Sequence, residues 1–152
     1  MIGEDYLIPK EMNLANQLCF SVYIANRLFN KFYQLALKEF DLTYPQYIVL
    51  LALWEQDNQT LNQLGKQLDL ESNTLTPLLK RLETAGWVIR HRDVADKRQL
   101  IVSLTQEGAA KQDNVFAAVT KWIDNGELDV EKYHEALRIN NDLINELTDS
   151  IK

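Results

Sequence analysis

Residues 72–86 read SNTLTPLLKRLETAG, and the rest of the chain is interpreted outward from this stretch. On a helical wheel its leucines share one narrow face, which predicts a helix packed on a core through Leu75, Leu78, Leu79 and Leu82. The outer face carries Asn73, Pro77, Lys80, Arg81 and Thr84. Because short polar side chains suit base edges and basic ones suit phosphates, we interpret this segment as a helix that enters the DNA major groove.

The start of this helix has two interpretations because of Pro77. Either Ser72 caps a helix that tolerates a kink at Pro77, or Thr76 is the cap and Pro77 takes the first helical position. The leucine face is the same in both. Solvated surface helices also carry Lys-Arg pairs, so the assignment depends on the neighbouring segments.

Those neighbours complete a helix-turn-helix pattern. Residues 43–46 (TYPQ) and 60–63 (TLNQ) are capping boxes, the first opening an apolar helix from Tyr47 to Trp54 and the second a helix through about Leu68. A break of three residues then leads into the helix at 72–86. Two short helices with a tight connection, the second polar and basic outside, are typical of helix-turn-helix proteins.

A β-hairpin is predicted directly after Gly86. Residues 87–92 and 99–104 are rich in β-branched side chains and are separated by a polar turn. The hairpin concentrates positive charge at Arg90, Arg92, Lys97 and Arg98. An arginine at a hairpin tip suits a narrow minor groove, although a solvated hairpin is the alternative.

Long apolar stripes flank this unit on both sides. Residues 11–40 give one continuous helical signal, and a helix of that length would extend beyond the core of its own chain. Thr105 caps a further helix, a break at 124–128 follows, and Asp129 caps a last helix with near-heptad apolar spacing. Stripes of this kind must be buried, so we expect a helical homodimer interface.

Composition limits the classes of protein. The 152 residues suit one domain. The net charge is −6, but residues 60–104 are basic, with seven Lys and Arg against five Asp and Glu, while the segments before and after them are acidic. No signal peptide or membrane-spanning run is present, so we expect a cytoplasmic protein. One cysteine and two distant histidines, His91 and His134, predict neither a metal site nor a disulfide framework. We expect no cofactor.

The lone cysteine, Cys19, lies beside the apolar stripe of residues 11–40. It is either a small buried hydrophobic side chain or a reactive thiol. Tyr23 and Tyr33 project to nearly the same side, but Tyr33 is about 21 Å further along the axis. Tyr33 therefore reaches Cys19 only of a partner helix that runs antiparallel, where phenols could donate hydrogen bonds to a thiolate. Ordinary interface packing is the alternative for both tyrosines.

Four segments resemble a known family: QLCF at 17–20, LTYPQY at 42–47, TLTPLLKR at 74–81 and DKR at 96–98. They are similar to the multiple antibiotic resistance regulator (MarR) family of winged-helix repressors, in its organic hydroperoxide resistance regulator branch of the one-cysteine type. The resemblance runs from about Leu14 to Gly108 and departs at Asn73, often glycine in that branch, and at Gln99. It implies one mainly α chain with a small β-hairpin wing, a winged helix-turn-helix at 43–104, and dimerisation helices at 11–40 and 105–152.

The resemblance also implies roles for individual residues. Cys19 would be the peroxide-sensing thiol, Tyr33 and Tyr44 the phenols that the partner subunit offers it, and Tyr23 a nearby aromatic residue of the same chain. Asp96 would orient Arg98, which would enter the minor groove. Together with the residue patterns above, the expected DNA contacts are Ser72, Asn73, Thr74, Thr76, Lys80, Arg81, Arg90, Arg92, Asp96 and Arg98.

The resulting hypothesis is a homodimeric repressor that binds a pseudo-palindromic operator and releases it when an organic hydroperoxide oxidises Cys19. With no second cysteine in the chain, the oxidised thiol would react with a low-molecular-weight thiol or oxidise further. One alternative is a repressor released by a phenolic or aromatic ligand, with Cys19 structural. A thiol peroxidase is disfavoured because no alternating βα pattern, Cys-x-x-Cys or resolving cysteine is present. We therefore do not expect an enzyme.

Overall fold

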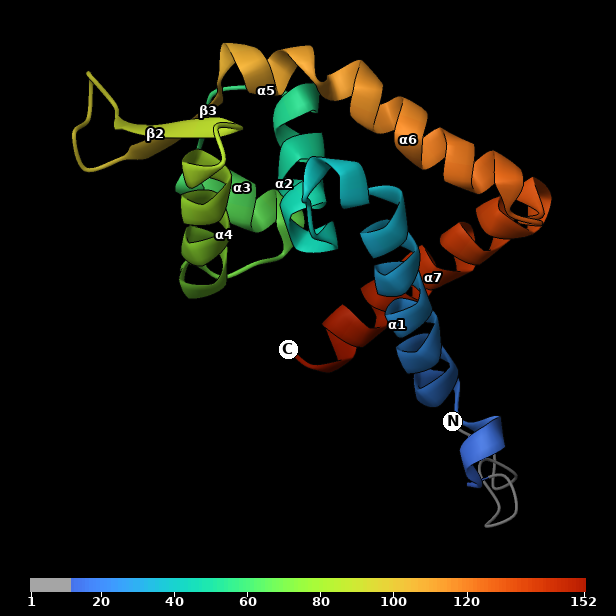
Figure 1. The fold of residues 1–152 in the computed structure, drawn as a ribbon. Coiled ribbons are helices and arrows are strands. Elements are labelled where there is room, and N and C mark those ends of the chain that lie inside the picture. The colour runs from blue at the N-terminus through green and yellow to red at the C-terminus, as the bar shows by residue number, and fades with distance from the viewer. Residues whose placement is uncertain (1–11) are drawn as a thin grey trace.

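The computed structural model describes residues 12–152, which form a mainly helical chain with a small antiparallel sheet (Figure 1). The fold class is therefore the predicted one, a winged helix-turn-helix with flanking helices. In chain order the elements are η1 Leu14–Asn16, α1 Leu18–Ala36, η2 Lys38–Phe40, α2 Tyr44–Glu55, β1 Gln59–Thr60, α3 Leu61–Leu68, α4 Ser72–Thr84, β2 Val88–Arg92, β3 Leu100–Leu104, α5 Gln106–Ala110, α6 Gln112–Asn125 and α7 Val130–Ser150.

The prediction of one continuous helix over residues 11–40 is wrong. Residue 11 lies outside the described residues, and α1 covers 19 residues with a 3-10 turn on either side. Gln17 has an extended backbone that interrupts the helix before α1, and Asp41 ends η2 in the left-handed region with φ 53°. Apolar spacing cannot distinguish an α-helix from the 3-10 turns that extend it, because side chains three residues apart share a face in both.

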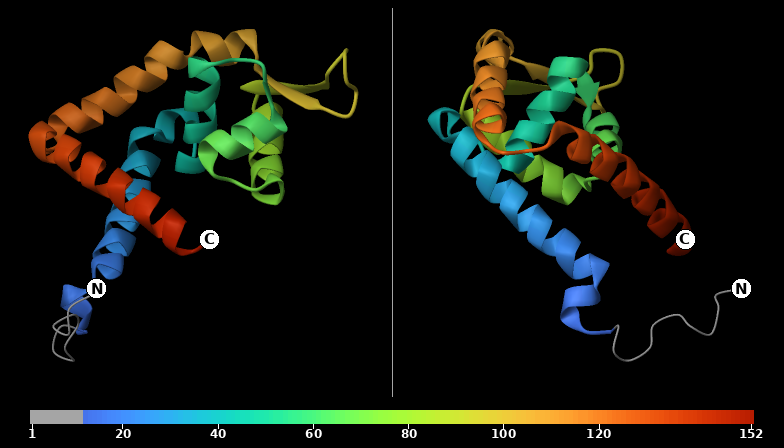
Figure 2. Two further views of the ribbon diagram at one scale, coloured as in Figure 1. Left: turned by 180° about the vertical axis from the view of Figure 1, so that it is seen from behind. Right: turned by 90° about the vertical axis from the view of Figure 1, so that its right-hand side faces the viewer.

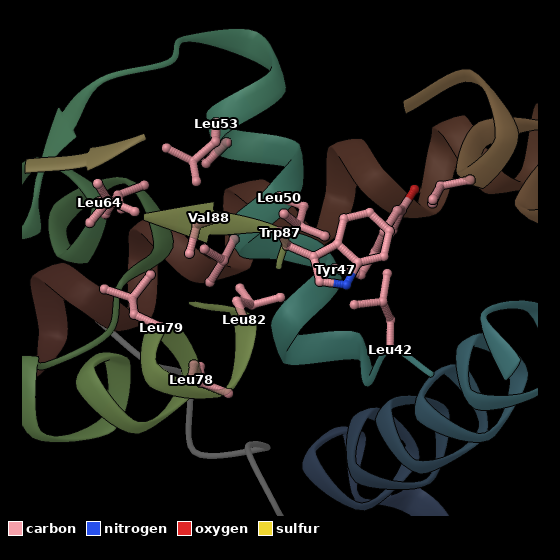
Figure 3. Close-up of a cluster of buried hydrophobic side chains, with 14 of the residues drawn as sticks. Leu42, Tyr47, Leu50, Leu53, Leu64, Leu78, Leu79, Leu82, Trp87 and Val88 are labelled. Carbon is pink, nitrogen blue, oxygen red and sulfur yellow. The ribbon is translucent and has the colours of Figure 1, made fainter. Parts of the chain in front are cut away.

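Both predicted capping boxes are confirmed. Thr43 Oγ1 accepts from Gln46 N at 3.3 Å while Thr43 N donates to Gln46 Oε1 at 2.9 Å, so α2 begins at Tyr44, three residues earlier than expected. Thr60 and Gln63 make the same pair of bonds at the start of α3. Helix α2 is buried on nearly every side and forms the centre of the core, as expected (Figure 3).

Helix α4 starts in a way that neither sequence interpretation anticipated. Its N-cap is Glu71, which makes no side-chain capping bond, so neither Ser72 nor Thr76 is the cap. Pro77 lies inside the helix. The predicted leucine face is confirmed, because all four leucines are buried against α2, α3 and the sheet, as Figure 3 shows for three of them.

The sheet has the order β1-β3-β2, and β2 with β3 forms the predicted hairpin. Strand β1 was not expected. Its two residues pair with Val102 and Ile101 of β3, more than forty residues further along the chain. A two-residue strand is too short to show an alternating pattern, so only the folded chain reveals it.

The C-terminal helices follow the expected breaks with one addition. Thr105 caps α5 as predicted, but Lys111 separates α5 from α6. Asp129 accepts from the backbone N–H groups of Glu131 and Lys132, which confirms the cap of α7. Figure 2 shows α6 leading away from the sheet and α7 turning back from the far end of α6. No helix within residues 12–152 is both long and apolar enough to cross a membrane.

Candidate DNA interface and thiol site

Helix α4 presents its polar face to solvent. The buried leucines hold one side, and the other exposes Ser72, Asn73, Thr74, Thr76, Lys80 and Arg81, all of them predicted DNA contacts. The turn before α4 is tight: Asp69 has φ 53°, and a Cβ on Gly65 would lie 2.8 Å from the Leu70 carbonyl oxygen. Glycine at position 65 therefore permits the close approach of α3 to the start of α4.

The tip of the hairpin holds its arginine as the resemblance implied. Asp96 Oδ1 accepts from Arg98 N at 3.1 Å and from Arg98 Nε at 3.2 Å. The Arg98 side chain is nevertheless 93% exposed, so its guanidinium is oriented and still free to contact a ligand. Arg92 Nη1 donates to the Arg98 carbonyl at 3.4 Å, which ties the strand to the tip. Arg90 differs, because its side chain is directed to Glu83 of α4.

The thiol of Cys19 is exposed at the second residue of α1. In the single chain it is therefore not the small buried hydrophobic residue of the alternative interpretation. Tyr23, one turn further, is also exposed and lies beneath the Arg27 guanidinium at 5.8 Å.

Tyr33, at the other end of α1, belongs to a cluster of phenols. Its ring centroid lies 4.7 Å from that of Tyr44 and 5.4 Å from that of Tyr47. Burial, followed by the neighbouring phenols, raises the pKa of Tyr33 to about 12. The Tyr33 hydroxyl therefore stays protonated near neutral pH and can donate a hydrogen bond.

Two members of the cluster were not predicted. Tyr47 lies one turn beyond Tyr44 on α2, so helical spacing could have found it. Tyr133 comes from α7 and contributes to the raised pKa of Tyr33, Tyr44 and Tyr47. No local pattern connects Tyr133 to α1 or α2, because the association is tertiary.

The thiol and the phenol cluster are separated within one chain. Cys19 and Tyr33 lie near opposite ends of α1, about 21 Å apart along the helix axis. One chain therefore holds the two halves of the predicted thiol site apart, as expected from the sequence. Within residues 12–152, no three His, Cys, Asp or Glu side chains are grouped in a way that could hold a metal ion.

A buried helix-turn-helix with an exposed polar face, followed by a basic hairpin, defines the class of winged-helix DNA-binding proteins. Residues 31–115 match the model of the SarA/Rot transcriptional regulators. This match covers more than half of the chain, and the chain belongs to that family of transcriptional regulators.

Individual relatives confirm the resemblance to organic hydroperoxide regulators. The organic hydroperoxide resistance transcriptional regulator of Bacillus subtilis is 47% identical over 98 residues, which are 64% of this chain and 67% of that protein. The structure of reduced AbfR bound to DNA has a TM-score of 0.85 at 49% identity, covering 94% of this chain and 98% of that one. Overoxidised AbfR bound to DNA gives 0.82 at 48% identity, covering 96% and 100%. AbfR is a protein of Staphylococcus epidermidis.

Proposed function

We propose that this regulator is a homodimeric repressor whose binding to a pseudo-palindromic operator is controlled by the reaction of Cys19 with an organic hydroperoxide. The observation that carries the proposal is the placement of the thiol and the phenols. The chain exposes its one thiol at the start of α1 and gathers protonated phenols at the far end. A second copy with α1 antiparallel would bring each thiol to the other copy's phenols.

Exposed apolar side chains support the dimer. Soluble monomers rarely expose large contiguous apolar patches. Here α1 exposes Leu18, Val22, Ile24, Leu28 and Phe29, and α7 exposes Val130, Tyr133, Leu137, Ile144 and Leu147. We define these ten residues as the apolar stripe. Its burial against a second copy is the simplest way to remove it from water.

DNA contact follows from the exposed face of α4 and from the hairpin tip. In a dimer, one α4 would enter each half-site, with centres about 34 Å apart. The polar side chains at positions 72–76 would face base edges, and Lys80, Arg81 and Arg92 would neutralise phosphates. Arg98, held by Asp96, would enter the adjacent minor groove.

The redox step begins with attack of the Cys19 thiolate on the terminal peroxide oxygen. An S–O bond forms, the O–O bond breaks, and the departing alkoxide takes a proton to leave as an alcohol. Sulfur is oxidised by two electrons to a sulfenic acid, and the peroxide is reduced. A low-molecular-weight thiol then displaces water from the sulfenic acid and leaves a mixed disulfide.

The mixed disulfide is the form that we propose releases DNA. The crystal structure of overoxidised AbfR has that protein bound to DNA, so added oxygen atoms alone are compatible with binding in that relative. A mixed disulfide is larger and would not fit beside the phenols of a packed dimer. The two α4 helices would then be moved out of register with successive major grooves.

The test is binding of the reduced full chain to a duplex from its own upstream DNA, repeated after a stoichiometric organic hydroperoxide with and without a low-molecular-weight thiol. We expect release only when both reagents are present and recovery after reduction. Cys19→Ser should bind DNA and never release it. The matched control is Cys19→Ser/Ser21→Cys, which keeps one exposed thiol on α1 but places it away from the proposed site. Normal release by either variant would contradict the proposal.

A further inference from the structure

An ion pair joins α4 to the first strand of the hairpin. Arg90 Nη2 lies 3.1 Å from Glu83 Oε1, and the backbone N–H of Arg90 donates to Glu83 Oε2 at 2.8 Å. Both carboxylate oxygens of Glu83 are thus used by one residue of β2. Glu83 is in the last turn of α4, the same helix whose exposed face carries the predicted base contacts.

The alternation of β2 explains why Arg90 faces α4. Successive side chains of a strand point to opposite faces, so Val88 and Arg90 share one face while Ile89 and His91 share the other. Val88 is fully buried in the core beside the leucines of α4, and this fixes which face is turned inward (Figure 3). Arg90 therefore lies against α4, not on the outer face of the wing.

The surroundings of Arg90 differ from those of the free arginines of the hairpin. Its side chain is 21% exposed, against 93% for Arg98. The Nε atom of Arg90 is buried and has no hydrogen-bond partner among the described residues, so this part of the guanidinium is withdrawn from water at an energetic cost. The side-chain hydrogen bond from Arg90, followed by the backbone one, lowers the pKa of the Glu83 carboxyl.

We infer that Glu83 and Arg90 are positioning residues for DNA binding, which lock the wing onto α4 so that Arg98 and the base-contacting face reach the DNA together. Arg90 then acts through Glu83 and not by contact with a phosphate. The inference rests on the proposed function in one respect, that Arg98 contacts DNA.

The direction in which one substitution changes the affinity for DNA distinguishes this inference from a purely electrostatic effect. Glu83 is an acidic residue on the helix that approaches a polyanion. Removing its charge should strengthen DNA binding if only long-range charge matters. The positioning role predicts the opposite, a loss of about fivefold in affinity for Glu83→Gln, because Gln keeps one acceptor oxygen and loses the charge. Glu71→Gln, at the other end of α4, is the matched control and should bind equally or more tightly.

The salt dependence tests the role of Arg90. Each phosphate contact contributes about −0.9 to the slope of the logarithm of affinity against the logarithm of salt concentration. Arg90→Gln should weaken binding to the same extent as Glu83→Gln with no change in that slope, and the double variant should be no worse than either single one. A shallower slope for Arg90→Gln, or additive losses in the double variant, would overturn the inference.

The Arg98→Ala variant provides a second background, which distinguishes a positioning role of Glu83 from a role in the stability of the fold. Without Arg98 the placement of the wing matters less, so Glu83→Gln should cost little affinity when added to Arg98→Ala. An equal loss in both backgrounds would show that Glu83 only stabilises the fold. If Arg98→Ala alone leaves the affinity for DNA and its salt dependence unchanged, the proposed wing contact is wrong. If Arg98→Ala weakens binding as expected but Glu83→Gln binds with wild-type affinity, only the positioning role is refuted.

Glu83→Asp keeps the charge and shortens the side chain by one carbon, so it serves if Glu83→Gln folds poorly. It should also lose affinity, because the shorter carboxylate cannot accept both Arg90 bonds. Wild-type affinity in this variant, with a folded dimer by gel filtration and circular dichroism, would overturn the inference.

Discussion

The winged-helix unit at residues 43–104 buries most of its apolar side chains, whereas the outer helices α1 and α7 leave most of theirs exposed. Within the unit, α4 buries four leucines and α2 contributes Val49, Leu50 and Leu53 with essentially no exposure. Helix α7 has 21 residues and buries none of them, and α1 buries only Ala36. One chain therefore completes the core of the DNA-binding unit, to which α6 adds Val115 and Val119, whereas most apolar side chains of α1 and α7 stay exposed.

The largest effect is expected where the core is complete. Leu79→Ala in α4 removes a side chain with no exposed surface and should lower the free energy of unfolding by about 2–5 kcal/mol. Denaturant unfolding measures this loss. Thr76→Ala, on the exposed face of the same helix, is the control and should change it by less than about 0.5 kcal/mol. Equal losses of unfolding free energy for Thr76→Ala and Leu79→Ala would contradict the burial of only one face of α4.

A smaller effect, on association and not on folding, is expected in α7. Ile144→Glu places a charge in the apolar stripe and should raise the dimer dissociation constant by at least about tenfold, or roughly 1.4 kcal/mol. Sedimentation velocity across a dilution series measures it. Asn145→Glu adds the same charge about 100° around the helix and should leave the dimer largely intact. An unchanged dissociation constant for Ile144→Glu would remove this part of α7 from the interface.

The smallest effect, on stability at high pH, is expected where the two regions meet, at the contact of Tyr33 of α1 with Tyr44 and Tyr47 of α2. Because the folded pKa of Tyr33 is raised, its neutral form contributes stability below pH 10 that is lost as the pH rises toward about 12. The raised pKa values of Tyr33, Tyr44 and Tyr47 should give late ionisations in an absorbance titration of the six tyrosines, and Tyr33→Phe should remove the latest of them. If the latest ionisation persists in that variant, another phenol of the cluster has the highest pKa.

The elements predicted most accurately are those that depend on contacts close in sequence. The capping boxes at Thr43 and Thr60, the cap at Asp129 and the end of α4 at Gly86, whose φ is 86°, were all readable from residue types. Each involves hydrogen bonds or backbone preferences within four residues. The contact between Asp96 and Arg98, which the family resemblance implied, is local in the same sense.

The predictions that failed or were missing depend on distant partners. The length of α1 was overestimated because periodicity continues through its 3-10 ends. Strand β1 forms only because β3 is present to pair with it. The partner of Arg90 was missing from the sequence interpretation, because no feature near position 90 indicated that Glu83 would bind it.

The helix-turn-helix, the leucine face and the hairpin with its arginine tip could be predicted from the sequence, since local hydrogen bonding and side-chain spacing specify them, and composition alone gives the single thiol. The pairing of charges and the clustering of the phenols became visible only in the folded chain. Those arrangements follow from burial, and which residues a strand or helix turns inward is settled when the elements pack together. For that reason Arg98 remains exposed while Arg90, eight residues earlier, is held against α4.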